Sequence, residues 1–237
     1  MLARLARISL SARTTLPVRP VVSTAYNFRP RTLATVNTHN MSALDYYNEI
    51  MVDHNNVRDL HKRFQEAYQN KNEKLMNDIA NTIVHEAALH SDGEELSIYK
   101  VLDAHDLHDA AEKDRAEHQE VKQAMSHIDS NSVSSLGMDE FANAVNKACQ
   151  MFDQHAQDEE NVQYKQLSAK LNAEEKASLA RDFLKAREMA PSRPHPSAPQ
   201  TGGIGQKLMG TMAKPVDAAV SGMRDFVDLK YQHASAA

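Results

Sequence analysis

The residues best able to do chemistry form a motif, H-x-x-x-E-E, that occurs twice. One copy runs from His90 to Glu95 and the other from His155 to Glu160. Positions i and i+4 of a helix lie on one face, about one turn apart. If both copies are helical, each presents an imidazole and a carboxylate on one side. Two such sides brought together offer the nitrogen and oxygen ligands that borderline and harder divalent metals favour.

The composition favours a helical soluble protein over a β-rich one. The chain has 237 residues, of which 41% are apolar and 25% charged, with seven Gly and no Trp. Twelve His is a high number for this length, and histidine is the commonest metal-binding side chain. The single Cys149 excludes an intrachain disulfide and a cysteine-cluster zinc site, and its simplest role is that of a small apolar residue on a helix. No apolar run approaches the roughly 18 residues of a membrane span.

Residues 1–40 differ from the rest of the chain because they contain six Arg, many Ser and Thr, and no acidic residue. This composition is typical of a mitochondrial targeting segment, which we expect to be disordered, although a basic tail without that role has the same features. A start at Met41 would instead give a cytosolic form. Removing the segment changes the net charge to −5 − 6 = −11, and this acidity argues against a nucleic-acid partner.

Four long segments follow, and each has apolar residues at the three- and four-residue spacing of a core-facing helix. The four helices are expected to begin near Ser42, Asn72, Leu107 and Asp139. Residues 129–137, rich in Ser and Asn, predict a loop. Because short connections favour antiparallel neighbours, residues 42–170 are predicted to form an all-α, up-down four-helix bundle.

A histidine lies in the apolar stripe of each predicted helix: His54, His90, His118 and His155. A single buried histidine is more often a hydrogen-bonded core residue than a ligand, because a buried polar group needs a partner. Counting along antiparallel helices, however, places all four, together with Glu94 and Glu159, within roughly 9 Å of one level at 1.5 Å per residue. Unrelated core histidines would rarely coincide in this way. The pattern therefore predicts one shared metal site.

Four imidazoles and two carboxylates exceed the ligand set of one tetrahedral zinc ion. They suit two ions that share bridging carboxylates, as in di-iron helical bundles. The second glutamate of each motif, Glu95 or Glu160, is then an outer partner of a ligand or an alternative bridge. A solvated charge beside the site is the competing interpretation for both.

The sequence resembles the hemerythrin family, in its HHE cation-binding branch. The resemblance rests on a lone histidine on the first helix, the H-x-x-x-E-E motifs on the second and fourth, and a histidine after an acid on the third. The resemblance covers roughly residues 42–170, and the Pro-rich stretch at 191–199 is similar to the segment that follows this domain in many fungal members. It implies a four-helix bundle with a non-haem centre of two iron ions, bridged by oxygen and two carboxylates. The iron ligands implied by the resemblance are His54, His90, Glu94, His118, His155 and Glu159, with both glutamates bridging. These ligand types also serve manganese and zinc.

The sequence departs from the oxygen-carrying hemerythrins on the third helix, where those proteins have two histidines one turn apart. Here His118 has Asp114 and Lys122 at that spacing, so a fifth histidine is missing. Asp114 is a candidate replacement, although an ion pair or a helix-start charge also explains it. In those carriers the fourth-helix acid lies five residues after its histidine, which here is Glu160. A missing ligand leaves a position open, which argues against simple oxygen carriage and suits oxidation, nitric oxide binding or iron sensing.

Beyond the bundle, residues 171–190 predict a fifth helix that begins at an Asn172 cap, and residues 191–210 a Pro- and Gly-rich linker. Residues 211–237 show an amphipathic pattern that would dock on the domain, pair with a partner or touch a membrane surface. We therefore expect a non-haem di-iron protein that binds oxygen, nitric oxide or iron itself. The alternatives are a di-iron oxidase or an enzyme that removes peroxide or nitric oxide at an open position, and a structural bundle whose histidines only pack.

Overall fold

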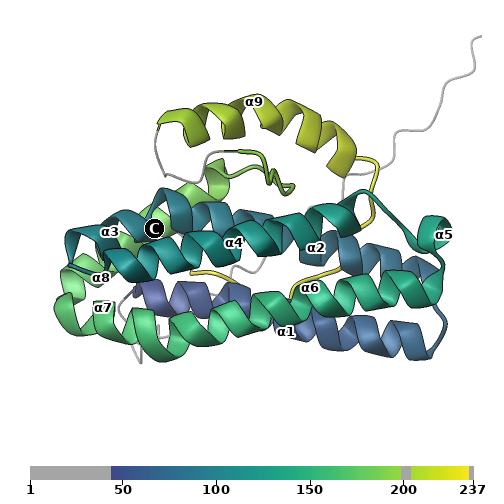
Figure 1. The fold of residues 1–237 in the computed structure, drawn as a ribbon, viewed down its shortest axis with the longest axis horizontal. Coiled ribbons are helices and arrows are strands. Elements are labelled where there is room, and N and C mark those ends of the chain that lie inside the picture. Colours follow the sequence, from purple (N-terminus) through teal and green to yellow (C-terminus); the bar gives the residue numbers. More distant parts are fainter. Residues whose placement is uncertain (1–43, 199–203, 235–237) are drawn as a thin grey trace, which may run out of the picture. The chain divides into compact units, whose positions relative to one another are not determined.

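The computed structural model describes residues 44–198 and 204–234, and these residues form helices and no strand. Four long helices make the bundle: α1 (Tyr46–Gln69), α2 (Glu73–Leu96), α4 (His108–Asp129) and α6 (Met138–Asp158). Each packs against two neighbours in the cyclic order α1, α2, α4, α6 (Figure 1). The predicted all-α helical bundle is confirmed. The expected targeting segment at residues 1–40 lies outside the described residues.

Polar caps determine where the first two helices begin. The Asp45 carboxylate accepts a hydrogen bond from the Tyr47 amide at 2.9 Å, so α1 begins at Tyr46 and not near Ser42. The Asn72 side chain accepts from the Leu75 amide at 3.1 Å and caps α2. Each cap satisfies one of the amides that the first turn of a helix leaves without a partner.

The expected second and fourth helices are interrupted, both close to the H-x-x-x-E-E motifs. The second ends at Leu96, and a separate helix α3 (Ile98–Ala104) follows. The fourth passes through a π-helical turn, η1 (Glu159–Gln163), before α7 (Tyr164–Lys170). The loop predicted at residues 129–137 contains one short helix, α5 (Val133–Leu136). Short π-helical turns inside α-helices occur frequently at functional sites.

The apolar core consists of two clusters that lie on either side of a polar layer. One cluster includes Leu60, Ile83, Met125, Phe141 and the buried Cys149. The other includes Ile50, Tyr99, Leu102, Tyr164 and Leu167. The predicted ligands come between members of the two clusters along α1 and α4, and also along α2 and α6 when these are followed into α3 and α7. The polar layer is therefore enclosed by hydrophobic packing at both ends.

The helix expected at residues 171–190 is α8 (Ala173–Met189), and it packs against α1 and α2. It begins with a capping box in which Asn172 and Glu175 satisfy each other's backbone amides. Gly93, inside the first motif, allows the close approach of α8, because a Cβ atom there would lie 3.1 Å from the Phe183 ring. A glycine within a helix costs roughly 0.5–1 kcal/mol relative to alanine, so its place here follows from packing.

The C-terminal part differs from the expected linker and amphipathic tail. Residues 190–198 have no regular structure, and α9 (Ile204–Ser221) begins inside the range expected for the linker. It ends well before the amphipathic pattern does, and residues 222–234 continue without a helix along the bundle. Among the described residues, no helix is both long and apolar enough to cross a membrane.

Candidate metal centre

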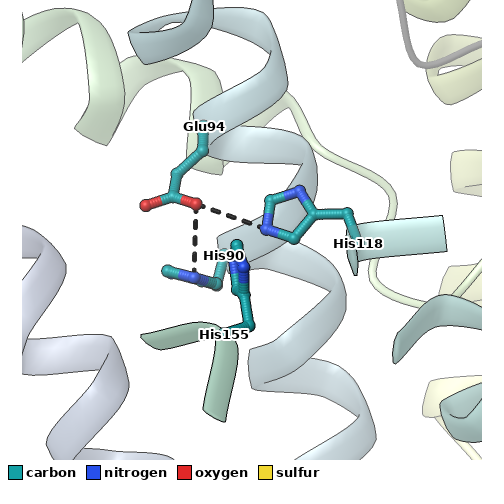
Figure 2. Close-up of side chains that lie close together, drawn as sticks. All are labelled: His90, Glu94, His118 and His155. Atoms are coloured by element: carbon teal, nitrogen blue, oxygen red, sulfur yellow. Dashed lines mark ion pairs between the residues drawn. The ribbon is translucent and has the colours of Figure 1, made fainter. Parts of the chain in front are cut away.

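The six residues predicted as ligands lie together in the polar layer, and each is at most 2% exposed. Their donor atoms form two overlapping groups, within each of which all atoms lie no more than 4.8 Å apart. The first group, drawn in Figure 2, contains His90, Glu94, His118 and His155. The second contains His54, His90, Glu94 and Glu159. Because His90 and Glu94 belong to both groups, the arrangement has the form of two adjacent cation positions.

Each glutamate in the centre lies between two histidines. Glu94 Oε2 is 3.4 Å from the Nε2 atoms of both His90 and His118. Glu159 Oε1 is 3.2 Å from His155 Nε2, and its Oε2 is 3.4 Å from His54 Nε2. Two ligand atoms at about 2.1 Å from one ion, at angles of 90–109°, are roughly 3.0–3.4 Å apart. The spacing of the donor atoms therefore matches that of ligands sharing a metal ion.

Most of the inward-facing atoms have no hydrogen-bond partner. These unpartnered buried atoms are Nε2 of His54, His90 and His155, and Oε2 of Glu94 and Glu159. His118 Nε2 differs, since it lies 3.2 Å from the Tyr99 hydroxyl. A buried polar atom without a partner costs about 1–3 kcal/mol, so five of them converging on one place would be strongly unfavourable unless they had a ligand. The donor set consequently fits a bound metal.

Every histidine of the centre also has a carboxylate beside its Nδ1 atom. The Nδ1 to carboxylate distances are 2.7 Å for His54 and Glu160, 2.9 Å for His155 and Glu117, 3.2 Å for His118 and Glu95, and 3.5 Å for His90 and Asp53. A carboxylate at Nδ1 favours the tautomer whose Nε2 lone pair faces inward, and it fixes the orientation of the ring. Glu95 and Glu160, left ambiguous by the sequence, are therefore outer partners of histidines.

These pairs follow one direction around the bundle. Each outer carboxylate is the chain neighbour of an inner residue: Asp53 of His54, Glu95 of Glu94, Glu117 of His118 and Glu160 of Glu159. Adjacent residues point about 100° apart on a helix, so when one faces the centre the other faces an adjacent helix. As a result, α1 supports the histidine of α2, α2 that of α4, α4 that of α6, and the turn after α6 that of α1.

A cation balances each outer carboxylate. The pairs are Arg58 with Glu160 at 2.8 Å, Lys122 with Glu95 at 2.8 Å, Lys113 with Glu117 at 3.2 Å, and Arg187 with Asp53 at 2.7 Å. The charges of the outer carboxylates are thus neutralised where they lie. Among the described residues, Glu94 and Glu159 pair with no lysine or arginine, and their ion-pair neighbours are the histidines of the centre.

The metal-free centre retains protons that a cation would displace. Burial raises the pKa of Glu94 well above its ordinary value, and the nearby Glu159 adds to the shift. Burial acts on Glu159 in the same direction, but the ion pairs with His155 and His54 lower its pKa well below the ordinary value. Burial alone would lower the pKa of His155, yet Glu159 and Glu117 raise it well above its usual range. For His90 burial dominates and lowers the pKa to about 4.

Tyr164 is a central residue that the sequence did not reveal. Its buried hydroxyl lies 2.6 Å from Glu94 Oε1 and 2.8 Å from Glu159 Oε1, so its one proton is shared between the two glutamates. Tyr164 follows Glu159 by five residues, and the π-helical turn η1 between them brings position i+5 toward the face of position i. A regular helical spacing does not predict this contact.

Asp114, the candidate for the missing ligand, is fully buried but belongs to neither inner group. It forms a separate group with Glu117 and His155, and Gln163 donates to its Oδ1 at 2.9 Å. Burial, assisted by the charge of Glu159, raises the pKa of Asp114 to about 8. The carboxyl therefore carries a proton at neutral pH and lies beside His155 as a neutral group.

This combination of a four-helix bundle and a buried His/Glu layer is that of the hemerythrin-like proteins. Residues 45–167 match the family model of the hemerythrin HHE cation binding domain, and the chain belongs to this family. It is also 30% identical, over 164 residues, to an uncharacterized hemerythrin-like protein of Schizosaccharomyces pombe, a match that covers 66% of this chain and 79% of that protein. No solved structure matches the chain.

Proposed function

We propose that this protein binds two iron ions in the His/Glu layer and, through them, a small ligand such as oxygen or nitric oxide, or serves to hold iron itself. The observation that carries the proposal is the convergence of five unpartnered buried donor atoms at the spacing of metal ligands. Iron bound there would supply reversible one-electron chemistry and affinity for diatomic molecules. The protein residues would hold and orient it, with Glu94 a member of both donor groups and Glu159 beside His54 and His155.

Exchange with solvent needs a path, and we propose that it passes His155. A surface pocket of about 320 Å³ between α4 and α6 has His155 and its partner Glu117 in its wall. A diatomic molecule or a hydrated ion is small enough to use a pocket of this size. The six protein residues, two of them shared, do not fill the coordination of two ions, which leaves positions for such a ligand.

Metal analysis of purified protein tests the proposal. We expect about two iron atoms per chain after growth with iron, together with a near-ultraviolet or visible absorption band. His118→Ala removes one inner donor and should lower the iron content, whereas His127→Ala, an exposed histidine on the same helix, should not. Iron content no higher in the wild type than in His118→Ala would disprove the proposed site.

The ligand can be identified by adding oxygen or nitric oxide to the reduced, iron-loaded protein. A spectral change that reverses when the gas is removed would indicate a carrier or sensor of that gas. No change with either gas, in protein that holds its iron, would leave iron itself as the ligand.

We also propose that the protein acts in mitochondria, because of the Arg-rich, acid-free composition of residues 1–40. Sequencing the N-terminus of the protein isolated from cells tests this localisation. A new N-terminus near residue 40 in a mitochondrial fraction is expected, and an intact Met1 would contradict it.

A further inference from the structure

The last part of the described chain, residues 224–234, lies along α1 and α2 and contacts buried polar side chains of both (Figure 1, yellow). The Asn56 side chain pairs with both backbone groups of Tyr231, accepting from its amide at 2.9 Å and donating to its carbonyl at 3.1 Å. The Thr82 hydroxyl accepts from the Val227 amide at 3.0 Å. Since Asn56 is 1% exposed, its amide would be left without these partners if the segment were absent.

This C-terminal segment ends on a partner of the metal centre. His233 Nε2 lies 2.9 Å from Asp53 Oδ1, and His233 Nδ1 lies 3.0 Å from Glu49 Oε2. The Ala234 amide donates to the same Glu49 oxygen at 3.1 Å. Asp53 is fully buried, and its other oxygen, Oδ2, is the atom 3.5 Å from His90 Nδ1.

Asp53 is therefore held from two sides that are remote in the sequence. Arg187 on α8 contacts both of its oxygens, at 2.7 Å and 2.9 Å, and His233 contacts Oδ1. The other three outer carboxylates lie 2.7–3.2 Å from their histidines, but Asp53 lies 3.5 Å from His90, whose Nδ1 atom makes no hydrogen bond. A small displacement of Asp53 would therefore decide whether it orients His90.

We propose that the C-terminal segment is a positioning element of the metal centre, in which His233 fixes Asp53 and Asp53 orients His90. His90 belongs to both groups of candidate donors, so its orientation affects whichever ion its inward Nε2 atom binds. The inference rests on the proposed metal-binding function. It assigns to residues 224–234, which lie outside the family domain at 45–167, a role in retaining the metal.

Thermodynamic linkage couples metal binding and docking of the C-terminal segment in both directions. If the docked segment increases metal affinity, bound metal must increase the stability of the docked segment by the same factor. The amides of Val227 and Tyr231, which donate to the bundle, should then exchange their hydrogens more slowly in metal-loaded than in metal-free protein.

Three variants of the full-length protein test the proposal. His233→Ala removes the contact with Asp53, His233→Gln retains a donor at that place, and Lys230→Ala changes an exposed residue of the same segment that touches only Asp59 and the Tyr231 ring. The dissociation constant for Fe²⁺ is measured by competition with a chromophoric chelator. Losing an outer partner of a metal-bound histidine weakens binding roughly 10–100-fold, and with Arg187 still in place we expect about 3–10-fold for His233→Ala.

His233→Gln should recover most of the affinity, and Lys230→Ala should match the wild type. The thermal stability of the metal-free variants serves as a separate readout. If His233→Ala lowers that stability but leaves the dissociation constant unchanged, the segment is merely structural and the proposal is wrong. If the wild type itself binds no metal, the proposed function fails, and the two failures are thereby distinguished.

Discussion

Replacing Tyr164 by phenylalanine tests the arrangement of the centre at its most connected atom. The substitution removes only the hydroxyl that joins Glu94 and Glu159 and keeps the ring in its buried position. Both carboxylates then lose a donor in a place that water does not reach. We expect the metal-free protein to lose stability, because the other atoms near these carboxylates do not move to replace the donor.

The size of the loss can be worked out from the charge of each acceptor. The Tyr164 hydroxyl has one proton to share between the Glu94 and Glu159 oxygens, so the two contacts count as one hydrogen bond. Glu159 is ionised, and a hydrogen bond to a charged group contributes about 1.5–3 kcal/mol. Losing this shared hydrogen bond therefore predicts a loss of about 1.5–3 kcal/mol in the free energy of unfolding.

Tyr46 provides the matched control. It is equally buried and lies edge-to-face with Tyr164, with ring centroids 5.8 Å apart, but its hydroxyl contacts only the Tyr164 carbonyl and the Ser168 hydroxyl. Tyr46→Phe should therefore cost about 1 kcal/mol, the value for neutral partners. Urea unfolding at pH 7 in the presence of a chelator gives both numbers. Equal losses for the two variants would refute the claim that Tyr164 stabilises a charged pair.

Three further outcomes are expected. Adding Fe²⁺ at about 100 times its dissociation constant should stabilise the protein by about 2.7 kcal/mol, or about 5–10 °C in melting temperature, and a chelator should abolish this gain. Metal affinity should rise between pH 6 and pH 8, because His54 and His155 have raised pKa values and bind metal only when neutral. The expected increase is up to about tenfold per pH unit for each proton displaced. A flat pH profile of the dissociation constant, measured by chelator competition, would contradict this. The raised pKa of Asp114, about 8 against roughly 3.9 when unfolded, contributes stability that is present below pH 4 and lost as the pH rises through 8. Between pH 5 and pH 8, the free energy of unfolding of the metal-free wild type should thus fall by up to about 1.4 kcal/mol per pH unit relative to that of Asp114→Asn. If urea unfolding instead gives the same pH dependence for both proteins, Asp114 is ionised.

Helical periodicity was enough to predict the bundle and to bring the six inner residues to one level. Apolar spacing identifies the face of each helix that is buried, and residue counting gives its height. The same information could not predict Tyr164, because its position depends on a π-helical turn that changes the phase of the helix after Glu159. It also could not predict the helix break at Ser97, since the apolar spacing continues through it to Ile98 and Val101.

The outer carboxylates could not be assigned for a different reason. Asp53 and Glu117 each directly precede a predicted ligand, yet each contacts the histidine of the next helix and not its own neighbour. Which helix is next depends on the cyclic order of the bundle, which amphipathic patterns in a single sequence do not specify. The contact between His233 and Asp53 is still less predictable, because 180 residues separate the two in the chain.

The cyclic order also explains why an acid stands beside every inner ligand or ligand pair. A helix that points one residue at the centre has the adjacent residue about 100° away, facing the next helix. A rotation of any helix by one residue would exchange the inner and outer roles, so the centre fixes the rotation of all four helices at once. In the sequence, this arrangement corresponds to four dipeptides in which an inner residue and an outer carboxylate are adjacent: Asp53-His54, Glu94-Glu95, Glu117-His118 and Glu159-Glu160. An acid next to one inner residue of every helix in the centre is therefore a stronger indication of an oriented metal centre than the H-x-x-x-E-E spacing alone, because it requires agreement between neighbouring helices as well as within one.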